Sequence, residues 1–168
     1  MKKKLQQQGV NLIELLLTLG ITVFLLGYAL PSYQRILEQQ RQNSELARLQ
    51  AVLSHARVIA TINNKQLQVC ASHNGQECDP SAYLSGNILI VTKDNQQAVH
   101  FSAGKGYPVV FPDSVISISP LSKQGLGGTL LPCTGFSKVN PKAITLSAVS
   151  RIRVNNTVSN SLTDLCPK

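Results

Sequence analysis

The chain has 168 residues, a length typical of one domain, and carries a formal net charge of +8. Hydrophobic residues make up 43% of it and aromatic residues only 5%, and much of the hydrophobic share lies between residues 10 and 30. What remains is a small domain rich in Ser, Thr, Asn and Gln with few charges. This composition argues against a cytosolic enzyme and favours an exported, β-rich domain.

The positive charge is concentrated at the two ends of the sequence. Three lysines lie in residues 2–4, whereas residues 10–113 hold equal numbers of basic and acidic side chains. From residue 114 onward the sequence has six basic residues and one acid, Asp164, which leaves a surplus of +5. Such a surplus favours an anionic partner such as nucleic acid, an acidic protein surface or lipid headgroups. Lysines that only keep the domain soluble are the alternative.

Residues 10–30 form an apolar run that begins after the lysines. As an α-helix this run would be about 31 Å long, which matches the hydrocarbon core of a bilayer. The lysines predict a cytoplasmic N-terminus, so the remainder of the chain would face outward. A cleavable secretory signal has a shorter core followed by a small-residue site, whereas the small residue here, Gly9, precedes the run. Cleavage after Gly9 would remove a basic leader, residues 1–9, and keep the membrane helix, residues 10–30.

Glu14 is an acid inside this apolar run. A carboxylate near the edge of a membrane helix costs about 2–3 kcal/mol unless it is paired. Cleavage after Gly9 would create a positively charged amine on Val10, available to Glu14 of the same chain or of a neighbouring one. Such a pair would neutralise both charges and set the register of adjacent helices. An acid that reaches the lipid interface without a specific partner is the alternative.

The stretch KKKLQQQGVNLIELLLTLGITVFLLGYALPSYQ resembles the type III signal of type IV prepilins and type II secretion pseudopilins. In that family a membrane peptidase cuts after the Gly and methylates the new N-terminus, the Glu five residues on is needed for assembly, and a Pro follows near the end of the span. Gly9, Val10, Glu14 and Pro31 stand at those positions, although Val10 replaces the usual Phe and Asn11 the common Thr.

The resemblance implies partners and a location. The partners would be the prepilin peptidase and other pilin subunits in a filament. The chain would first cross the inner membrane once, with its C-terminus in the periplasm. It would then be incorporated into an extracellular type IV pilus.

A helical pattern continues beyond Pro31. Apolar residues recur at three- and four-residue steps from Leu46 to Ala60, whereas Glu45 and Arg48 lie off that stripe. We therefore expect one helix over residues 11–62. Its outer half, residues 31–62, would pack on a sheet.

Residues 63–168 alternate turns with strand-like runs, namely KQLQVCAS, NILIVTKDN, AVHFSAG, YPVVFP, VISISP, GTLLPCTGF and AITLSAVSRIRVN. We expect an antiparallel β-domain with a basic C-terminal region, packed against the outer half of the helix. The fold class is therefore α+β and resembles the pilin fold. The spacing of Cys70, Cys78, SGNILIVTKDN and the late SRIRV is similar, more narrowly, to the GspH/FimT family of minor pilins and pseudopilins.

The cysteines predict disulfides and not a metal site. None of Cys70, Cys78, Cys133 and Cys166 forms a C-x2-C pair, and the histidines do not flank them at finger-like spacing. An even count in an exported chain favours two disulfides, for which three pairings exist. We favour Cys70–Cys78 across the turn CASHNGQEC and Cys133–Cys166, which would tether the C-terminal tail. The second closes a loop of about 30 residues and contributes about 3 kcal/mol in the chain-entropy model.

No enzymatic constellation is visible. His55, His73 and His100 lie on the helix, in the cysteine-flanked loop and on a strand, without a nucleophile or carboxylate beside them in the pattern. We therefore expect neither a catalytic activity nor a cofactor.

The run AITLSAVSRIRVN alternates with a period of two. Read as one strand, it turns the even-numbered residues toward the core and the odd-numbered ones outward. Arg151 and Arg153 would then share an exposed face about 7 Å apart, close to the phosphate repeat along one nucleic-acid strand. Arginine forms bidentate bonds to phosphate, and Lys138 and Lys142 would extend the positive field. An edge strand whose arginines only keep the protein soluble is the alternative.

The same run resembles a functional motif. In FimT-like minor pilins of naturally competent bacteria, a Gly-Arg-x-Arg motif near the C-terminus binds DNA during uptake. SRIR, from Ser150 to Arg153, retains both arginines and replaces the Gly by Ser, which would weaken binding if the Gly allows close backbone approach. The resemblance implies a minor type IV pilin that binds double-stranded DNA through its phosphates, independently of sequence, and promotes natural transformation.

Two structural roles stay open beside this function. One is a GspH-like minor pseudopilin of a type II secretion filament. The other is a minor pilin that acts in pilus assembly or initiation. In either role the basic strand would contact a neighbouring subunit.

Overall fold

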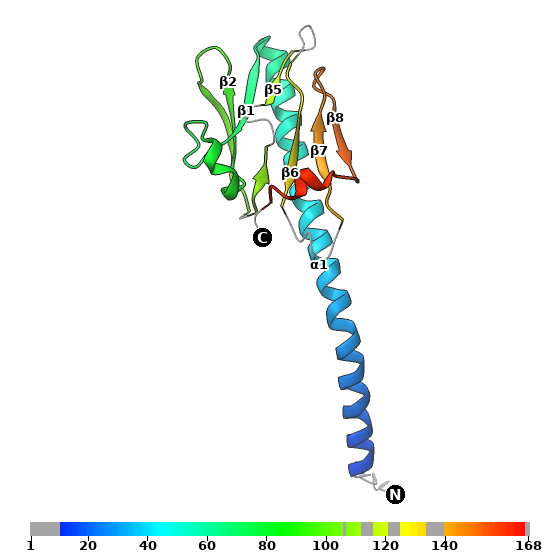
Figure 1. The fold of residues 1–168 in the computed structure, drawn as a ribbon. Helices are drawn as coiled ribbons and strands as arrows, with labels where there is room; N and C mark the ends of the chain where they lie inside the picture. The colour runs from blue at the N-terminus through cyan, green and yellow to red at the C-terminus, as the bar shows by residue number, and fades with distance from the viewer. Residues whose placement is uncertain (1–10, 106, 112–115, 121–124, 134–139, 167–168) are drawn as a thin grey trace, which may run out of the picture. The chain divides into compact units, whose positions relative to one another are not determined.

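The computed structural model describes residues 11–105, 107–111, 116–120, 125–133 and 140–166. The chain divides into two compact units, residues 1–37 and 38–168. The long helix α1 (Leu12–Asn63) contributes to both (Figure 1).

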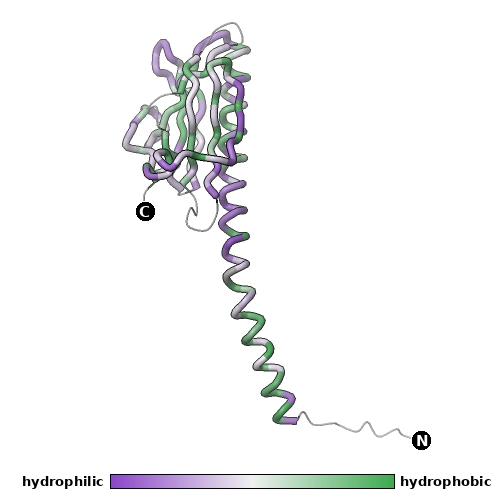
Figure 2. The backbone as a smooth tube through the Cα atoms, turned by 45° about the vertical axis from the view of Figure 1, so that its right-hand side comes forward, coloured by the Kyte–Doolittle hydropathy of each residue, from purple (hydrophilic) through white to green (hydrophobic). Residues whose placement is uncertain are grey.

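In the first unit, the apolar side chains of α1 are exposed throughout residues 12–30. Figure 2 colours much of this part of the helix as hydrophobic. Phe24, for example, is 77% exposed. The hydroxyls of Thr18 and Thr22 donate to the carbonyls of Leu15 and Thr18, at 2.9 and 2.7 Å, so the helix satisfies its own hydroxyl groups. By length and composition this part of α1 is suited to cross a membrane.

The second unit contains the rest of α1 and, among the described residues, two four-stranded antiparallel sheets. In the first the strand order is β3 (Ala98–Ser102), β2 (Ile88–Thr92), β1 (Leu67–Ala71), β5 (Ile116–Ile118). In the second it is β4 (Val109–Val110), β6 (Gly128–Pro132), β7 (Ala143–Leu146), β8 (Ile152–Asn155). The sequence pattern did not predict two short helices, η1 (Pro80–Ser85) and α2 (Asn160–Thr163).

The outer half of α1 packs on both sheets, whereas the sequence predicted packing on one sheet. Its apolar stripe from Leu46 to Ala60 lies on one face of the helix because the spacing follows the helical repeat. The strand residues that share this core are Leu67, Val69, Ile88, Ile90, Val109, Ile116, Ile118, Leu130, Ile144 and Leu146. Each large aliphatic side chain buried there stabilises the fold by about 1.5–3 kcal/mol relative to its exposed state. The predicted α+β fold, a long N-terminal helix against an antiparallel domain, is confirmed.

A buried ion pair attaches α1 to the loops beside the first sheet. The side chain of Glu45 is 1% exposed and that of Arg48 is 13% exposed. The guanidinium donates to Glu45 Oε1 through Nε, at 2.9 Å, and through Nη2. It also donates to Ser102 Oγ (2.9 Å) and to the carbonyls of Gly86 (2.8 Å) and Ala103 (3.2 Å). Both residues lie off the apolar stripe, as predicted. They are nevertheless largely buried, and the bonds of Arg48 compensate charges that burial would otherwise leave unpaired, although Glu45 Oε2 has no partner among the described residues.

The helix η1 begins at a capped turn. The Asp79 carboxylate accepts from the hydroxyl and the backbone N–H of Ser81, at 2.7 and 2.8 Å. These bonds, the hydroxyl's first, lower the pKa of Asp79, and His73 lowers it further from 3.7 Å away. The helix ends at Gly86, whose φ is +67°, and a Cβ there would lie 2.0 Å from the Tyr107 carbonyl oxygen. Only glycine fits at this position.

Candidate nucleic-acid interface

The prediction of one strand over residues 143–155 is wrong, because the segment is a β-hairpin. β7 and β8 lie side by side (Figure 1) and pair antiparallel. Thr145 lies opposite Arg153. The N–H of Ser150 donates to the Ser147 carbonyl at 2.8 Å, and the N–H of Ser147 donates to the Arg151 carbonyl at 3.0 Å. Ser150 has a φ of +57°. This is the pattern of the three-residue hairpin loop, in which a left-handed residue follows a type I turn.

The alternation between the two faces nevertheless continues from one strand to the next. Each odd-numbered residue of β7 pairs with an odd-numbered residue of β8, and paired residues point to the same side of a sheet. The even-numbered Ile144, Leu146 and Ser150 are buried, as expected. Two even-numbered residues are exposed, Ala148 in the turn and Val154 near the end of β8.

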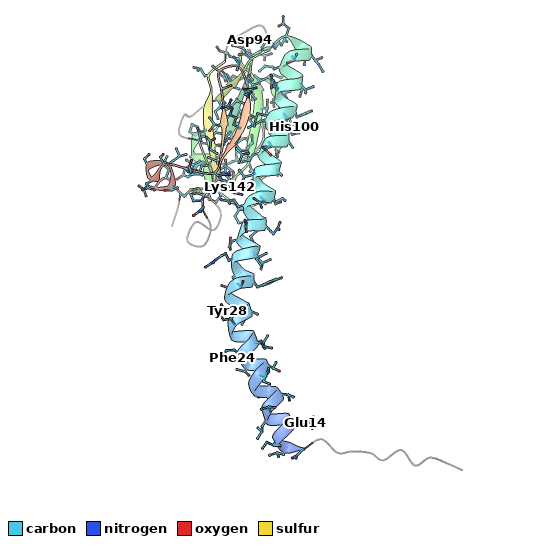
Figure 3. All side chains as sticks on the ribbon, turned by 90° about the vertical axis from the view of Figure 1, so that its right-hand side faces the viewer. Glu14, Phe24, Tyr28, Asp94, His100 and Lys142 are labelled. Carbon is cyan, nitrogen blue, oxygen red and sulfur yellow. A yellow bond between two sulfur atoms is a disulfide. The ribbon has the colours of Figure 1, made fainter. Side chains whose placement is uncertain are left out.

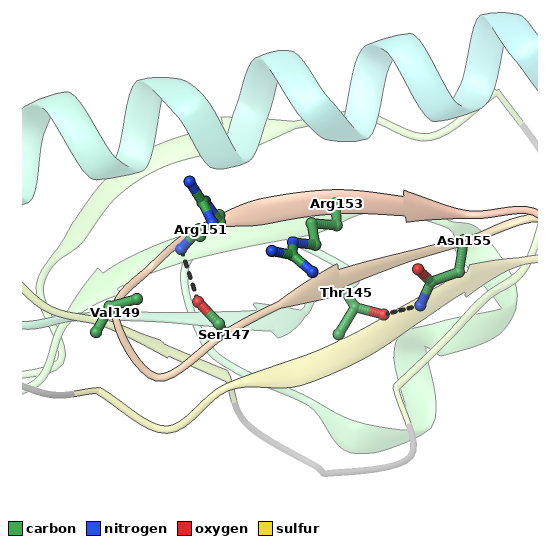
Figure 4. Close-up of a pocket in the computed structure, with 6 residues that line it drawn as sticks. All are labelled: Thr145, Ser147, Val149, Arg151, Arg153 and Asn155. Atoms are coloured by element: carbon green, nitrogen blue, oxygen red, sulfur yellow. Dashed lines mark hydrogen bonds between the residues drawn. The ribbon is translucent and has the colours of Figure 1, made fainter.

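The outward face of the hairpin carries both arginines. Arg151 and Arg153 are exposed and line one surface hollow, called here the arginine hollow, together with Thr145, Ser147, Val149 and Asn155 (Figure 4). Asn155 Nδ2 donates to Thr145 Oγ1 at 2.7 Å, and the N–H of Arg151 donates to Ser147 Oγ at 3.1 Å. The two arginines therefore share an exposed face, as the alternation predicted.

Neither guanidinium is neutralised by an acid within the part of the chain that the structure describes. The ion pairs there join Arg41 to Glu38, Arg48 to Glu45 and His73 to Asp79. Two uncompensated guanidinium groups on one face raise the local positive potential. Each retains donors for charge-assisted bonds to an anion. The arginine hollow is therefore chemically suited to phosphate groups.

The two lysines expected to extend this field are placed differently. Lys142 (Figure 3) precedes β7 at the end away from the turn. Its Nζ donates to Asn43 Oδ1 of α1 at 3.2 Å. It does not line the arginine hollow. Lys138 lies outside the described residues. Of the four basic residues singled out from the sequence, the structure brings Arg151 and Arg153 together.

Ser150 stands where the resemblance has a glycine, and the backbone gives a reason for glycine there. A φ of +57° is left-handed, a conformation that glycine adopts with least strain. The serine hydroxyl is buried against Ser119. It accepts from the Ser119 N–H at 3.3 Å and donates to the Ser119 carbonyl at 3.4 Å. These bonds anchor the turn to the segment after β5 and offset part of the strain.

The C-terminal tail lies against the end of the second sheet away from the turn. Cys166 is bonded to Cys133, which follows β6. Val158 and Leu162 of the tail pack in an apolar cluster with Leu131. The tail is therefore held to the sheet by a covalent bond and by buried apolar contacts. The other disulfide joins Cys70 to Cys78, so the pairing favoured from the sequence is the one observed.

The processing residues Gly9 and Val10 lie outside the described residues. The described part of α1 begins at Leu12, and the Asn11 side-chain oxygen accepts from the Ile13 N–H at 3.4 Å, a weak N-cap. Glu14 is in the first turn (Figure 3), where the helix dipole favours a carboxylate. This placement stabilises α1 independently of any partner charge on Val10.

The three histidines do not lie together in one cluster. The rings of His55 on α1 and His100 on β3 pack edge to face with centroids 4.8 Å apart, whereas His73 faces Asp79. Within the described ranges no group of three or more His, Cys, Asp or Glu residues is placed to hold a metal ion.

The sequence placed the neutral lining of the arginine hollow on the outward face but did not single it out as part of a binding site. Thr145, Ser147 and Asn155 are odd-numbered members of the same alternating run, so the signal for a shared face was present. They carry no charge to mark them, and only the turn brings β7 beside β8.

The structure matches that of the type IV minor pilin FimU from Pseudomonas aeruginosa in two crystal forms. For one form the TM-score is 0.53 at 12% sequence identity, covering 78% of this chain and 96% of that chain. For the other it is 0.51 at 12% identity, covering 75% and 97%. The chain therefore has a fold like that of this pilin. No protein-family model and no curated protein sequence matches the chain.

Proposed function

We propose that the chain is a minor pilin of a type IV pilus that binds double-stranded DNA without sequence preference and promotes DNA uptake in natural transformation. The observation that carries the proposal is the exposed pair Arg151 and Arg153, which lie on one face of a hairpin without an acidic partner among the described residues. The pilin-like fold and the apolar part of α1 support a place in a filament.

Binding through phosphates follows from the chemistry of the pair. Alternate side chains of a strand lie about 7 Å apart, so Arg151 and Arg153 contact successive phosphates of one DNA strand. Each guanidinium donates two parallel bonds to a phosphate group. Because the contacts go to the backbone, recognition is nearly independent of sequence and weakens steeply with salt. Several subunits on one filament raise the avidity of a weak single site.

The DNA test uses the full chain in neutral detergent and short labelled duplexes of unrelated sequence at several salt concentrations. Arg151→Gln and Arg153→Gln are measured singly and together. The control Lys93→Gln/Lys105→Gln removes the same charge from exposed positions next to β2 and β3. We expect the double arginine variant to bind at least tenfold more weakly and to lower the slope of log K against log salt by about two. Equal weakening by the lysine control, or no binding by the parent at low salt, contradicts the proposal.

Assembly is proposed to depend on removal of the leader. Prepilin peptidase cuts between Gly9 and Val10, and the new amine on Val10 pairs with Glu14 of a neighbouring subunit. Before assembly α1 crosses the inner membrane once with the C-terminus in the periplasm, and the subunit then enters an extracellular pilus. The support is the exposed apolar surface of residues 12–30 with one acid inside it.

Mass spectrometry of the chain isolated from its host tests the processing step. The expected mass is that of a chain starting at a methylated Val10. A chain that keeps Met1 contradicts the proposal, irrespective of the outcome of the DNA experiment.

A structural role is the second candidate, and the likeness to a minor pilin favours it as well. The chain would then initiate a pilus, or cap a secretion filament as a GspH-like pseudopilin, with Arg151 and Arg153 against an acidic surface of the next subunit. In that case Arg151→Gln/Arg153→Gln lowers the number of filaments, and the parent chain does not bind DNA.

A further inference from the structure

A continuous series of surface hollows leads away from the arginines. The arginine hollow shares Thr145 and Asn155 with a second hollow. The second shares Thr157 and Val158 with a third, which reaches Asn160. The three hollows therefore follow one another along β8 and into the C-terminal tail. Four of their polar side chains, those of Thr145, Asn155, Thr157 and Asn160, are called here the β8 track.

The β8 track is held in shape from both sides. On the sheet side Thr129 of β6 lies opposite Thr145 of β7, and Thr145 lies opposite Arg153. On the tail side the disulfide of Cys166 and the apolar contacts of the partly buried Leu162 fix the chain that follows β8. A surface ordered before its ligand arrives loses little conformational entropy on binding.

The chemistry changes along this path from cationic to neutral. Among the described residues that line the second and third hollows, none is charged. One N–H of the Asn155 amide donates to Thr145 Oγ1 at 2.7 Å. The second Asn155 N–H and the Thr145 hydroxyl hydrogen therefore remain to donate to a ligand. Neutral donors of this kind bind phosphate and sugar oxygens in nucleic-acid complexes. They do so without releasing the counterions that a cation displaces.

We propose that the β8 track binds the continuation of the DNA strand whose phosphates the arginines hold, so that the strand lies along β8 and not across the hairpin turn. This inference rests on the proposed function. At the rise of a strand, the path from Arg151 to Thr157 is about 20 Å long, several times the separation of the two arginines. Arg151 and Arg153 then supply the salt-dependent part of the binding and the β8 track supplies a salt-independent part.

The first experiment measures the salt dependence of binding by track variants. The full chain in neutral detergent is titrated against a short labelled duplex, and Asn155→Ala/Thr157→Val is compared with Arg151→Gln/Arg153→Gln. We expect the track variant to bind about three- to tenfold more weakly at every salt concentration with an unchanged slope. The neutral control Gln76→Ala/Gln97→Ala removes two exposed amides outside the track and binds like the parent. Parent-like binding by the track variant, or a slope lowered as in the arginine variant, overturns the inference.

A gain-of-function variant excludes misfolding as an explanation. Asn160→Lys places a cation at the far end of the track and raises the slope by about one with tighter binding at low salt. Gln97→Lys adds the same charge outside the track and does not. Equal behaviour of the two lysine variants overturns the inference. When the parent binds through its arginines and both track experiments are negative, the inference alone fails; when the parent does not bind DNA, the proposed function fails with it.

Discussion

Arg48 and the pair Arg151 and Arg153 belong to the same compact unit, but their surroundings differ. The Arg48 guanidinium is almost covered, pairs with Glu45 and donates to loop oxygens. The guanidinium groups of Arg151 and Arg153 are exposed on one face of a hairpin without an acid beside them among the described residues. The first arrangement uses the donors of arginine inside the protein, and the second leaves them for a ligand.

The difference indicates that an arginine's role depends on whether its N–H donors are already hydrogen-bonded within the protein. That state decides whether the residue contributes to stability or to ligand binding. A satisfied, buried guanidinium contributes to the stability of the fold, because removal of one partner leaves the other charge buried and unpaired. An exposed guanidinium without a partner contributes little to stability. It contributes instead to association with anions. The following changes test this division.

The largest expected effect is that of Arg48→Ala. Removal of the guanidinium leaves the Glu45 carboxylate buried without its partner, so we expect the free energy of unfolding to fall by about 3–5 kcal/mol. Urea denaturation of the full chain in neutral detergent measures it. The matched control Arg153→Ala is expected to change stability by less than about 0.5 kcal/mol. Equal losses in both variants would falsify the division between the two environments.

Removal of the tail disulfide tests whether the arginine pair acts with the tail or alone. Cys133→Ser/Cys166→Ser opens a sequence separation of 33 residues, and Cys70→Ser/Cys78→Ser one of 8. The chain-entropy model gives losses of about 3–4 and about 2–3 kcal/mol, respectively. We expect only the first variant to bind DNA more weakly at temperatures where both are folded, because it frees the wall of the β8 track. Equal DNA binding by the two variants would show that the arginines suffice.

Substitutions of Ser150 separate the effect of backbone strain from that of hydrogen bonding in the turn between β7 and β8. Both Ser150→Ala and Ser150→Gly remove the bonds to Ser119, but only glycine relieves the left-handed φ. We therefore expect the glycine variant to be more stable than the alanine variant by about 1 kcal/mol in thermal or urea unfolding. Variants of equal stability would contradict the strain assigned to this turn.

Periodicity predicted much of this molecule because it reports on which face of an element is packed. The stripe from Leu46 to Ala60 identified the packed face of α1, and the period of two placed Arg151 and Arg153 outward. Periodicity did not predict the structure where a local segment depends on partners distant in the sequence. The burial of Glu45 depends on Arg48, whose guanidinium is in turn held by oxygens as far along the chain as the Ala103 carbonyl. The hairpin depends on a serine in a glycine conformation.

Asp79 is a further test of the comparison, because its carboxylate is partly exposed and yet accepts two hydrogen bonds. Its side chain is 43% exposed, but two bonds from Ser81 hold the carboxylate at the start of η1. If hydrogen bonding, and not burial, decides whether a charged side chain stabilises the fold, Asp79 contributes to stability despite its exposure. Its pKa in the folded state is lowered from 3.8, chiefly by the Ser81 hydroxyl and then by the Ser81 N–H.

The sign of the pH effect follows from this lowered pKa. A carboxyl that releases its proton more readily when folded stabilises the fold above the pKa of the unfolded chain, near 3.8. That contribution disappears as the pH falls through the lower, folded pKa. We expect the parent to lose more stability than Asp79→Asn below about pH 4, as measured by urea denaturation at stepped pH. Asp94→Asn removes an exposed acid from the β2–β3 turn and controls for net charge. Parallel pH profiles for the parent and Asp79→Asn would mean that an exposed carboxylate contributes nothing even when it is hydrogen-bonded, and that burial decides the role.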